Sequence, residues 1–338
     1  MTKFNHYKQV QDYCSQASVI ILGSGASVAL GLPTMDELAK YIKSSINAKQ
    51  IPRNQMSNWK EFCYHLNAKI DLESALHKVN FSEEMTDIIA SSAWKLINRR
   101  DEKVYKNSLT GRCTFPLGRL LSYMFRSTKK KINIVTTNYD RLAEYACDQE
   151  EWHHHNGFSH GYTKKLSKSK NRVTCDRTVN IWKVHGSLDW FRSESDETIA
   201  VASVKHIPDE YKPQIVTPGI RKYQRTYLEP LRTIIANADT ALDNANSYLC
   251  FGFGFRDEHI QPKMLLRCRN DNASITIATH TLTKQAKDFL FSQEIKNFLA
   301  IERGERDEQS RIFSSLHDGP ISINKNHWSM DGFIELIA

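Results

Sequence analysis

Four short stretches of the 338-residue sequence combine glycines with side chains that can move protons or bind a polar ligand. In chain order they are "GSGAS" (23–27), "TTNYD" (136–140), "KVHGS" (183–187) and "FGFGFRDEHI" (251–260). Each follows or ends a short apolar run of the kind that forms a buried strand. Because α/β folds bind ligands at the carboxyl ends of their strands, we expect all four stretches to face one site.

The two glycine-rich stretches favour close approach of the backbone to an anion. Glycines directly after a strand let N–H groups reach a phosphate with no Cβ in the way, and a helix N-terminus attracts negative charge. Residues 23–27 lack the third glycine of the usual dinucleotide fingerprint, so a plain tight turn is the alternative. After Gly252 and Gly254, the residues Arg256 to His259 would also suit the start of a helix.

The other two stretches carry the side chains suited to catalysis. His185 is expected at a strand end before a Gly-Ser turn, where an imidazole can act as a base near neutral pH; a hydrogen-bonded structural histidine is the alternative. Lys183 precedes it by two residues, so the strand period places both on one face. Asn138 and Asp140 offer an amide and a carboxylate for a carboxamide and a ribose, although Asn138 alone would also cap a helix.

These stretches need parallel strands to bring them together. Residues 18–33 read as a strand and a glycine turn, and 131–147 as strand, turn and helix. Between them the apolar spacing is helical from about 34 to 125, with Thr34 as N-cap and Glu37 completing a capping box. Further strands are expected in "VNIWKVHGS", "QIVTPG", "SYLCFGFGF" and "SITIAT", and a helix in "QRTYLEPLRTIIANADTALDNA". The alternation predicts an α/β fold with a Rossmann-like, doubly wound, mostly parallel sheet and an inserted helical module.

Composition excludes several classes of protein. With 40% hydrophobic and 25% charged residues the chain can bury a full core. We expect a cytoplasmic protein without a membrane span, because no apolar run approaches the roughly 18 residues a span needs. The seven cysteines are scattered, without a Cys-x-x-Cys pair, and neighbouring histidines in "WHHHNGFSH" (152–160) alternate sides of an extended chain. We therefore expect reduced thiols and no metal.

The formal charge of +8 leaves an anionic ligand or a nucleic acid open. Much of the excess lies in "RSTKKK" (126–131) and "TKKLSKSKNR" (163–172), which are poor in apolar residues. A single-strand-binding groove would interleave aromatic side chains with the basic ones, and these runs lack them. Solvated loops are the favoured interpretation.

Taken together and in order, the motifs resemble the Sir2-like family, and the bacterial antiphage NADases more than the sirtuin deacylases. The resemblance covers roughly residues 18–280, including "DLESAL" in the helical module. It implies one Sir2-like domain over 1–338, with a Rossmann-like core at 15–33 and 131–290, a helical insertion at about 34–125 and a C-terminal extension at 291–338.

The resemblance also implies a site that takes NAD as substrate and cleaves it to nicotinamide and ADP-ribose. His185 would be the catalytic base, Asn138 would orient the nicotinamide amide or the attacking water, and Asp140 would stabilise charge at the ribose. Gly23, Gly25 and Ser27 would approach the pyrophosphate, and Gly252 and Gly254 would border the adenosine. The full set of implied NAD-binding residues is Gly23, Ser24, Gly25, Ala26, Ser27, Thr137, Gly252, Gly254 and Phe255.

The family further implies a role as the NAD-depleting effector of an antiphage, abortive-infection system. The part after residue 280 is short for a separate sensor, so control is expected from homo-oligomerisation or a partner protein. A HerA-type hexameric ATPase is the favoured partner, ahead of a short Argonaute. One alternative is an NAD-dependent deacylase, which the missing zinc cysteines disfavour, since only Cys250 and Cys268 follow His185. Another is a non-catalytic NAD or ADP-ribose sensor, which could dispense with the histidine.

Overall fold

The structure is a computed structural model, and it describes residues 5–159, 163–166, 177–217, 227–292 and 295–337. Of the two basic stretches, residues 126–130 connect a helix to a strand and are mostly exposed, as expected for a loop. The second stretch begins with a short strand at 163–165, and from residue 167 on it lies outside the described residues, as do His160 and Cys175.

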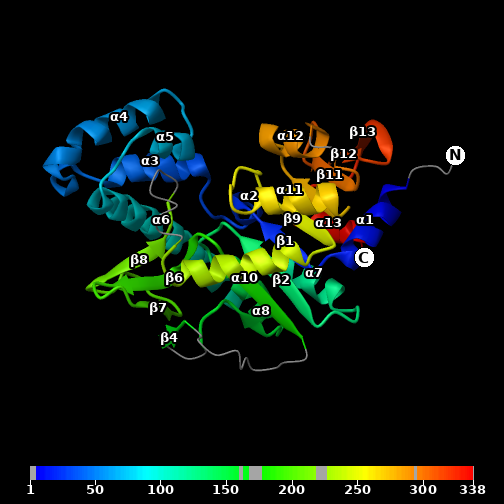
Figure 1. Cartoon of the computed structure of the whole chain (residues 1–338), viewed down its shortest axis with the longest axis horizontal. Coiled ribbons are helices and arrows are strands. Elements are labelled where there is room, and N and C mark those ends of the chain that lie inside the picture. The colour runs from blue at the N-terminus through cyan, green and yellow to red at the C-terminus, as the bar shows by residue number, and fades with distance from the viewer. Residues whose placement is uncertain (1–4, 160–162, 167–176, 218–226, 293–294, 338) are drawn as a thin grey trace.

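The main sheet confirms the predicted α/β class. Its strands are β1 (Val19–Leu22), β2 (Lys131–Thr136), β3 (His154–His155), β5 (Thr178–Lys183), β9 (Ser247–Phe251), β10 (Ser274–Thr279), β11 (Phe298–Arg303), β12 (Ser310–Ser314) and β13 (His317–Ile323). Among the described residues these nine strands run in the order β13-β12-β11-β10-β9-β1-β2-β5-β3 (Figure 1). From β11 to β3 all neighbours pair in parallel, and β12 and β13 add antiparallel strands at one edge.

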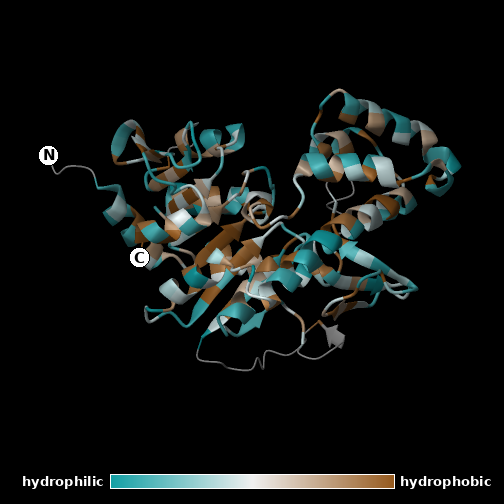
Figure 2. Ribbon diagram, turned by 180° about the vertical axis from the view of Figure 1, so that it is seen from behind, coloured by the Kyte–Doolittle hydropathy of each residue, from teal (hydrophilic) through white to brown (hydrophobic). Residues whose placement is uncertain are grey.

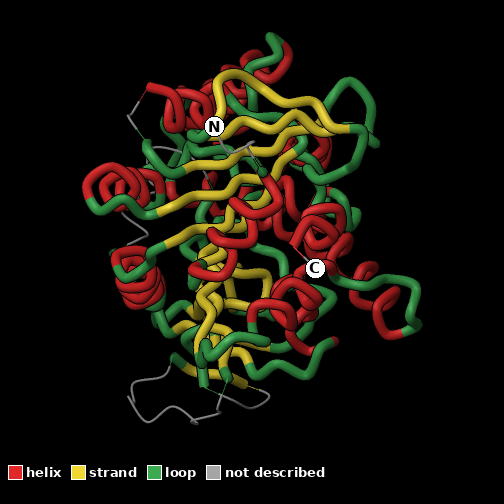
Figure 3. Tube along the Cα trace, turned by 90° about the vertical axis from the view of Figure 1, so that its right-hand side faces the viewer, coloured by secondary structure: helices red, strands yellow, loops and turns green. Residues whose placement is uncertain are grey.

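Helices cover both faces of this sheet, as expected of a doubly wound fold (Figure 3). Within β1, Ile20 and Leu22 belong to one core and Val19 and Ile21 to the other, because successive side chains of a strand point to opposite faces. The brown strands at the centre of Figure 2 lie between these two cores. The first core includes α1 (His6–Gln16), α7 (Pro116–Met124), α8 (Leu142–Gln149) and α13 (Met330–Ile337), and the second includes α10 (Leu231–Asp243), α11 (Gln261–Asn270) and α12 (Lys284–Ser292).

Residues 34–125, all of them described, contain helices and no strand, as the apolar spacing predicts. The short α2 (Ser24–Val28) precedes this segment, which holds two 3₁₀ turns (Ala48–Gln50 and Arg53–Gln55) and the helices α3 (Met35–Ser45), α4 (Met56–Asn67), α5 (Leu72–Lys78) and α6 (Glu83–Leu109), followed by α7. The capping box of Thr34 and Glu37 is present at the start of α3. Helices α3 to α6 stand as a group beside the sheet (Figure 1). The division into core, insertion and extension stays a proposal.

A second sheet is antiparallel, and the sequence did not predict it. It contains β4 (Thr163–Lys165), β6 (Gly186–Ser193), β7 (Thr198–Val201) and β8 (Tyr211–Ile215), in the order β4-β7-β6-β8. The "QIVTPG" run therefore ends a strand of this sheet, and its assignment to the main sheet is wrong. Gly186, at φ +89°, lets the chain leave β5 and enter β6 directly, so one apolar run supplies a strand to each sheet.

The two ends of the chain add elements that the sequence reading left unassigned. Helix α1 packs on the main sheet, and the segment after residue 291 continues that sheet through β11, β12 and β13 before α13. Helix α13 contacts both α1 and α7. Among the described residues, none of the helices has the length and apolar character that a membrane crossing requires.

A buried ion pair joins the helical segment to the main sheet. Asp101 of α6 is fully buried and accepts hydrogen bonds from the backbone N–H and Nε of Arg141, at 2.8 and 2.9 Å. The Arg141 Nη2 lies 2.6 Å from the same carboxylate, and the hydroxyl of Tyr145 donates to it at 2.6 Å. Because Arg141 directly follows the "TTNYD" stretch, the pair fixes the backbone that carries Asn138 and Asp140.

Removing the buried carboxylate is expected to destabilise the whole chain. Asp101→Ala leaves the Arg141 guanidinium buried without its partner, which typically costs about 3–5 kcal/mol of unfolding free energy. The measurement is urea unfolding followed by circular dichroism. The control is Asp307→Ala, which removes the surface partner of Arg303 and should cost less than about 1 kcal/mol. Equal losses of unfolding free energy in Asp101→Ala and Asp307→Ala would show that the buried ion pair does not stabilise the fold.

Candidate active site

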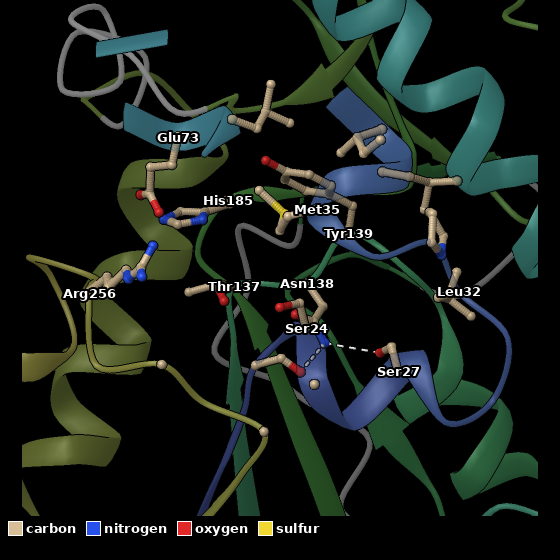
Figure 4. Close-up of a pocket in the computed structure, with 18 of the residues that line it drawn as sticks. Ser24, Ser27, Leu32, Met35, Glu73, Thr137, Asn138, Tyr139, His185 and Arg256 are labelled. Carbon is tan, nitrogen blue, oxygen red and sulfur yellow. Dashed lines mark hydrogen bonds between the residues drawn. The ribbon is translucent and has the colours of Figure 1, made fainter. Parts of the chain in front are cut away.

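A cleft of about 390 Å³ lies where the main sheet meets helices α3, α5 and α6. The carboxyl-end turns of β1, β2, β5 and β9 all contribute to it. Arg256 and Glu73 lie at the same end as His185, and Ser27 and Leu32 lie at the other (Figure 4). Its polar lining comprises Ser24, Ser27, Glu73, Thr137, Asn138, Tyr139, Asp140, His185, Thr217, Arg256, Asp257, Thr279 and Thr283.

The cleft brings most of the predicted site residues together. Ten of them line it: Gly23, Ser24, Gly25, Ser27, Thr137, Asn138, Asp140, His185, Gly252 and Gly254. Two do not. Ala26 lines a neighbouring cavity of about 180 Å³, and the Phe255 side chain is fully buried against Phe253 and Phe289. The side chain of Phe255 therefore faces the core, which removes it from contact with a ligand in the cleft.

The two glycine turns are in direct backbone contact. The N–H of Gly25 donates to the carbonyl of Gly252 at 3.1 Å. A Cβ at Gly252 would lie 2.2 Å from the backbone nitrogen of Ala26, and one at Gly23 would lie 2.3 Å from the Gly252 oxygen. Gly254 has no such neighbour, since its nearest contact is 3.7 Å away. Gly23, Gly25 and Gly252 are thus required for the turns to pack together, whereas the sequence pattern indicates only close approach of the backbone to an anion.

Asn138 is held by the first glycine turn. Its Nδ2 donates to the Gly23 carbonyl at 2.9 Å and to the Ser27 hydroxyl at 3.0 Å (Figure 4). A carbonyl oxygen only accepts, so this contact fixes which end of the amide is nitrogen. The open alternative, that Asn138 caps the next helix, is wrong, because the oxygen that accepts from the Leu142 N–H belongs to Asp140.

Asp140 is a buried carboxylate at the floor of the cleft. It accepts from the Ser27 hydroxyl at 2.7 Å and from the Leu142 N–H at 3.2 Å. Burial raises its pKa to about 6, against the opposing effects of the Lys183 ammonium and the Ser27 hydroxyl. The site therefore contains a carboxyl group that changes protonation state in the mildly acidic range.

Lys183 supports the site from below and does not line the cleft. It is fully buried, forms an ion pair with Glu144 at 2.9 Å and donates a hydrogen bond to the Ser187 hydroxyl oxygen at 2.9 Å. Its ammonium also donates to the backbone carbonyl of Asp140. The expectation that it shares the cleft face with His185 is wrong. Its ammonium binds the carboxylate of Glu144 in α8 and the backbone carbonyl of Asp140, and both lie beneath the cleft.

His185 stands in the turn between β5 and β6. The backbone N–H of Val216 donates to its carbonyl at 2.8 Å, and the Nε2 of its ring lies 2.9 Å from Oδ2 of Asp257. The sequence also suits the start of a helix at Arg256 and Asp257, yet both residues line the cleft, and α11 begins only at Gln261. The signal that would have found them is their place directly after the second glycine turn.

The described part of the histidine-rich stretch, residues 152–159, does not line this cleft. His154 and His155 form β3 at the edge of the main sheet, and the His154 Nε2 lies 3.1 Å from an oxygen of Asp148. In the part of the chain that the structure describes, no group of three histidine, cysteine, aspartate or glutamate side chains is arranged to hold a metal ion.

The sequence model of the SIR2-like domain matches residues 132–311, which is just over half of the chain. The chain belongs to the SIR2-like domain family. The match contains "TTNYD", "KVHGS" and the second glycine turn. In the fold of this SIR2-like chain, the first glycine turn contacts "TTNYD" and the second glycine turn. No curated protein matches the sequence.

Several solved structures are similar to this SIR2-like chain. A mutant Sir2 homologue in complex with 2′-O-acetyl-ADP-ribose is 12% identical, with 99% of this chain and 96% of that chain covered and a TM-score of 0.45. A Sir2 homologue in complex with NAD is 12% identical, covering 87% and 88%, with a TM-score of 0.40. A structure from work on sirtuin substrate affinity is 14% identical, covering 83% and 90%, with a TM-score of 0.43.

A side chain at position 252 is expected to force the glycine turns apart. Gly252→Ala places a Cβ within 2.2 Å of backbone at a φ of +56°, whereas Gly319→Ala has a φ of +77° but open space around it. Both variants share the cost of the positive φ, about 1–2 kcal/mol. The clash should add about 1–3 kcal/mol at position 252. Urea unfolding of both variants measures the difference, and equal losses would exclude a packing role for Gly252.

Burial of Asp140 predicts a specific pH dependence of stability. Its pKa is about 6 in the folded chain against an ordinary 3.8, so between these values the folded state keeps a proton that the unfolded state has released. Relative to Asp140→Asn, the unfolding free energy of the wild type should therefore fall as the pH rises from about 4 to 6, then stay level. Urea unfolding at several pH values tests this, and a constant difference would contradict it.

Proposed function

We propose that this chain is an NAD⁺ glycohydrolase that cleaves NAD⁺ to nicotinamide and ADP-ribose. The observation that carries the proposal is the meeting of Asn138, Asp140 and His185 in one cleft bounded by both glycine turns. Membership of the SIR2-like family supports NAD as the ligand, and a Sir2 homologue similar in fold has been solved with NAD bound.

The substrate would lie along the polar lining of the cleft. Its diphosphate would lie against the glycine turns, where Arg256 supplies a guanidinium that is 47% exposed and 3.7 Å from Asp71 in this structure. An arginine beside exposed glycine backbone suits a diphosphate, because its planar fork matches phosphate oxygens. The adenosine would extend toward Gly254, Thr279 and Thr283, at the ends of β9 and β10.

The chemical step is proposed as cleavage of the bond between the ribose C1′ and the pyridinium nitrogen. The bonding electrons pass to that nitrogen, which leaves as neutral nicotinamide, so little acid catalysis is needed and the transition state resembles an oxocarbenium ion. The Nδ2 of Asn138 is held by Gly23 and Ser27, which leaves the Oδ1 as the acceptor that orients the attacking water or a ribose hydroxyl. Asp140 stabilises the positive charge on the ribose when it is ionised.

His185 would accept the proton that the attacking water or ribose hydroxyl loses. Water then bonds to C1′, ADP-ribose forms, and the proton passes from the imidazole to solvent. General-base assistance of this kind typically contributes about 10²–10⁴-fold to the rate. The peptide deacylase alternative has less support, since the sequence lacks the two Cys-x-x-Cys pairs of a zinc ribbon.

The biological role is proposed from the family resemblance. The chain would act in the cytoplasm as the NAD-depleting effector of an antiphage system, assembled as an oligomer and controlled by a partner such as a HerA-type ATPase. An uncontrolled NADase would harm its host, so we expect little activity until the partner is present. Assays are therefore needed both with the chain alone and with any ATPase encoded beside it.

Loss of His185 or Asn138 should abolish NAD cleavage without unfolding the chain. His185→Ala and Asn138→Ala are each expected to lower turnover by at least about 100-fold, because each removes a group that acts at the reacting atoms. Chromatography of NAD, nicotinamide and ADP-ribose measures turnover, and circular dichroism checks the fold. The control is His206→Ala, which removes an exposed histidine outside the cleft lining.

The outcomes separate the functional candidates. Nicotinamide and ADP-ribose from the wild type and the His206 control, but not from the two cleft variants, would support the glycohydrolase. Bound NAD that is never consumed, with or without a partner, would instead favour a sensing module. Near-normal turnover in either cleft variant would remove that residue from the mechanism.

A further inference from the structure

The carboxylate of Asp257 is in contact with the imidazole that the proposed reaction uses. The Oδ2 of Asp257 lies 2.9 Å from the Nε2 of His185, and the two side chains are only 6% and 11% exposed. The residues come from different turns, one after β9 and the other after β5. The fold therefore brings them together across the cleft, although 71 residues separate them in sequence.

Asp257 is held firmly in this position. Its other oxygen, Oδ1, accepts from the backbone N–H groups of His259 and Ile260 at 3.0 and 3.1 Å, so it caps the turn before α11. The turn before it is shaped by Phe255, a bulky residue at φ +55° whose ring lies 4.9 Å from the ring of Phe253. Such backbone conformations are unfavourable and concentrate at functional sites. Oδ1 thus accepts the hydrogen bonds that cap the turn, and Oδ2 lies beside the ring of His185.

The contact has a chemical consequence for the imidazole. A carboxylate accepts and never donates, so it favours the tautomer that carries the proton on the nitrogen facing it. In the described structure Oδ2 lies close to Nε2 but not along the direction of a hydrogen bond. For that bond to form, the ring has to rotate until its Nε2–H points at Oδ2. Nε2 is then the donor, and Nδ1 keeps the lone pair that a base needs.

We propose that Asp257 is a positioning residue that orients His185 and fixes its tautomer. Nε2 carries the proton held by the Asp257 carboxylate, and Nδ1 accepts the proton released by the attacking water or ribose hydroxyl. The imidazolium formed in that step lies beside the carboxylate, which stabilises it until Nδ1 gives up its proton to solvent. This inference rests on the proposed function of the cleft, and it adds the atom of His185 that acts as base.

Two substitutions remove the contact of the Asp257 carboxylate with His185 but keep hydrogen bonds to the turn before α11. Asp257→Asn keeps an oxygen in the place of Oδ1, so the cap survives, but it replaces Oδ2 with an NH₂ group that donates to Nε2 and favours the opposite tautomer. Asp257→Ser keeps a capping hydroxyl and is too short to reach the ring. The matched control is Glu258→Gln, a neutralised carboxylate at the adjacent, exposed position.

The experiment uses the full chain, with any required partner, and records two quantities for each variant. The first is kcat and KM for NAD. The second is the ¹⁵N chemical shifts of the ring nitrogens of His185 in histidine-labelled protein, assigned with His185→Ala, at a pH where the ring is neutral. We expect Asp257→Asn to lower kcat by at least about 100-fold with KM changed less than about threefold, since a comparable substitution in a serine protease leaves the geometry intact but gives the wrong tautomer. Thermal unfolding confirms that each variant folds.

In the wild type, the shifts should place the proton on Nε2, and in Asp257→Asn they should place it on Nδ1. Asp257→Ser should lower kcat without this reversal, and Glu258→Gln should match the wild type. Unchanged shifts and kcat in folded Asp257→Asn would overturn the proposal and leave Asp257 as a cap. If the wild type cleaves no NAD, the proposed function fails. The ¹⁵N shifts of the ring alone then test whether Asp257 fixes the tautomer of His185, and an unchanged tautomer in Asp257→Asn overturns that role. Should Asp257→Asn not fold, a wild-type kcat in Asp257→Ser overturns it.

Discussion

The site depends on the contact between two glycine turns at the ends of neighbouring strands. β1 and β9 pair in parallel, so the turns that follow them leave the same edge of the sheet side by side. Without a Cβ at positions 23, 25 and 252 their backbones can touch, and the Gly25 N–H bonds to the Gly252 carbonyl. Any side chain at these positions would separate the turns by overlapping with backbone. The cleft residues that the two turns carry, among them Ser27, Arg256 and Asp257, are therefore positioned by that contact.

Each turn then positions one part of the candidate catalytic group. The carbonyl of Gly23 holds the amide of Asn138, and Ser27 from the same turn bonds to both Asn138 and Asp140. The second turn continues into Arg256 and Asp257, which reach toward the proposed diphosphate and toward His185. The positions of Asn138 and Asp140 therefore depend on the first turn, and the contact between Asp257 and His185 depends on the second. Because the two turns touch, displacement of either one would change the distances among these groups.

Buried charges fix the other side of the site. Lys183 bonds to the backbone of Asp140 and pairs with Glu144, while Arg141 pairs with Asp101 from the helical segment. Taking such charges out of water is costly, so their value lies in geometry more than in net stability. They hold residues 138–141 in one conformation, and with the burial of Asp140 they set the electrostatic environment of the proposed ribose site.

The fold class, the helical segment at 34–125 and ten of the residues that line the cleft could be predicted from the sequence, because they follow from local patterns. Apolar runs, the Thr34 capping box and glycines after strands report on neighbours a few residues away. What lies across the cleft could be seen only once the elements were packed together. The roles of Lys183 and Asp257, the inward side chain of Phe255 and the second sheet all depend on contacts between distant segments. Periodicity tells which face of a strand is buried, whereas the partner that a buried polar group meets depends on how the elements pack.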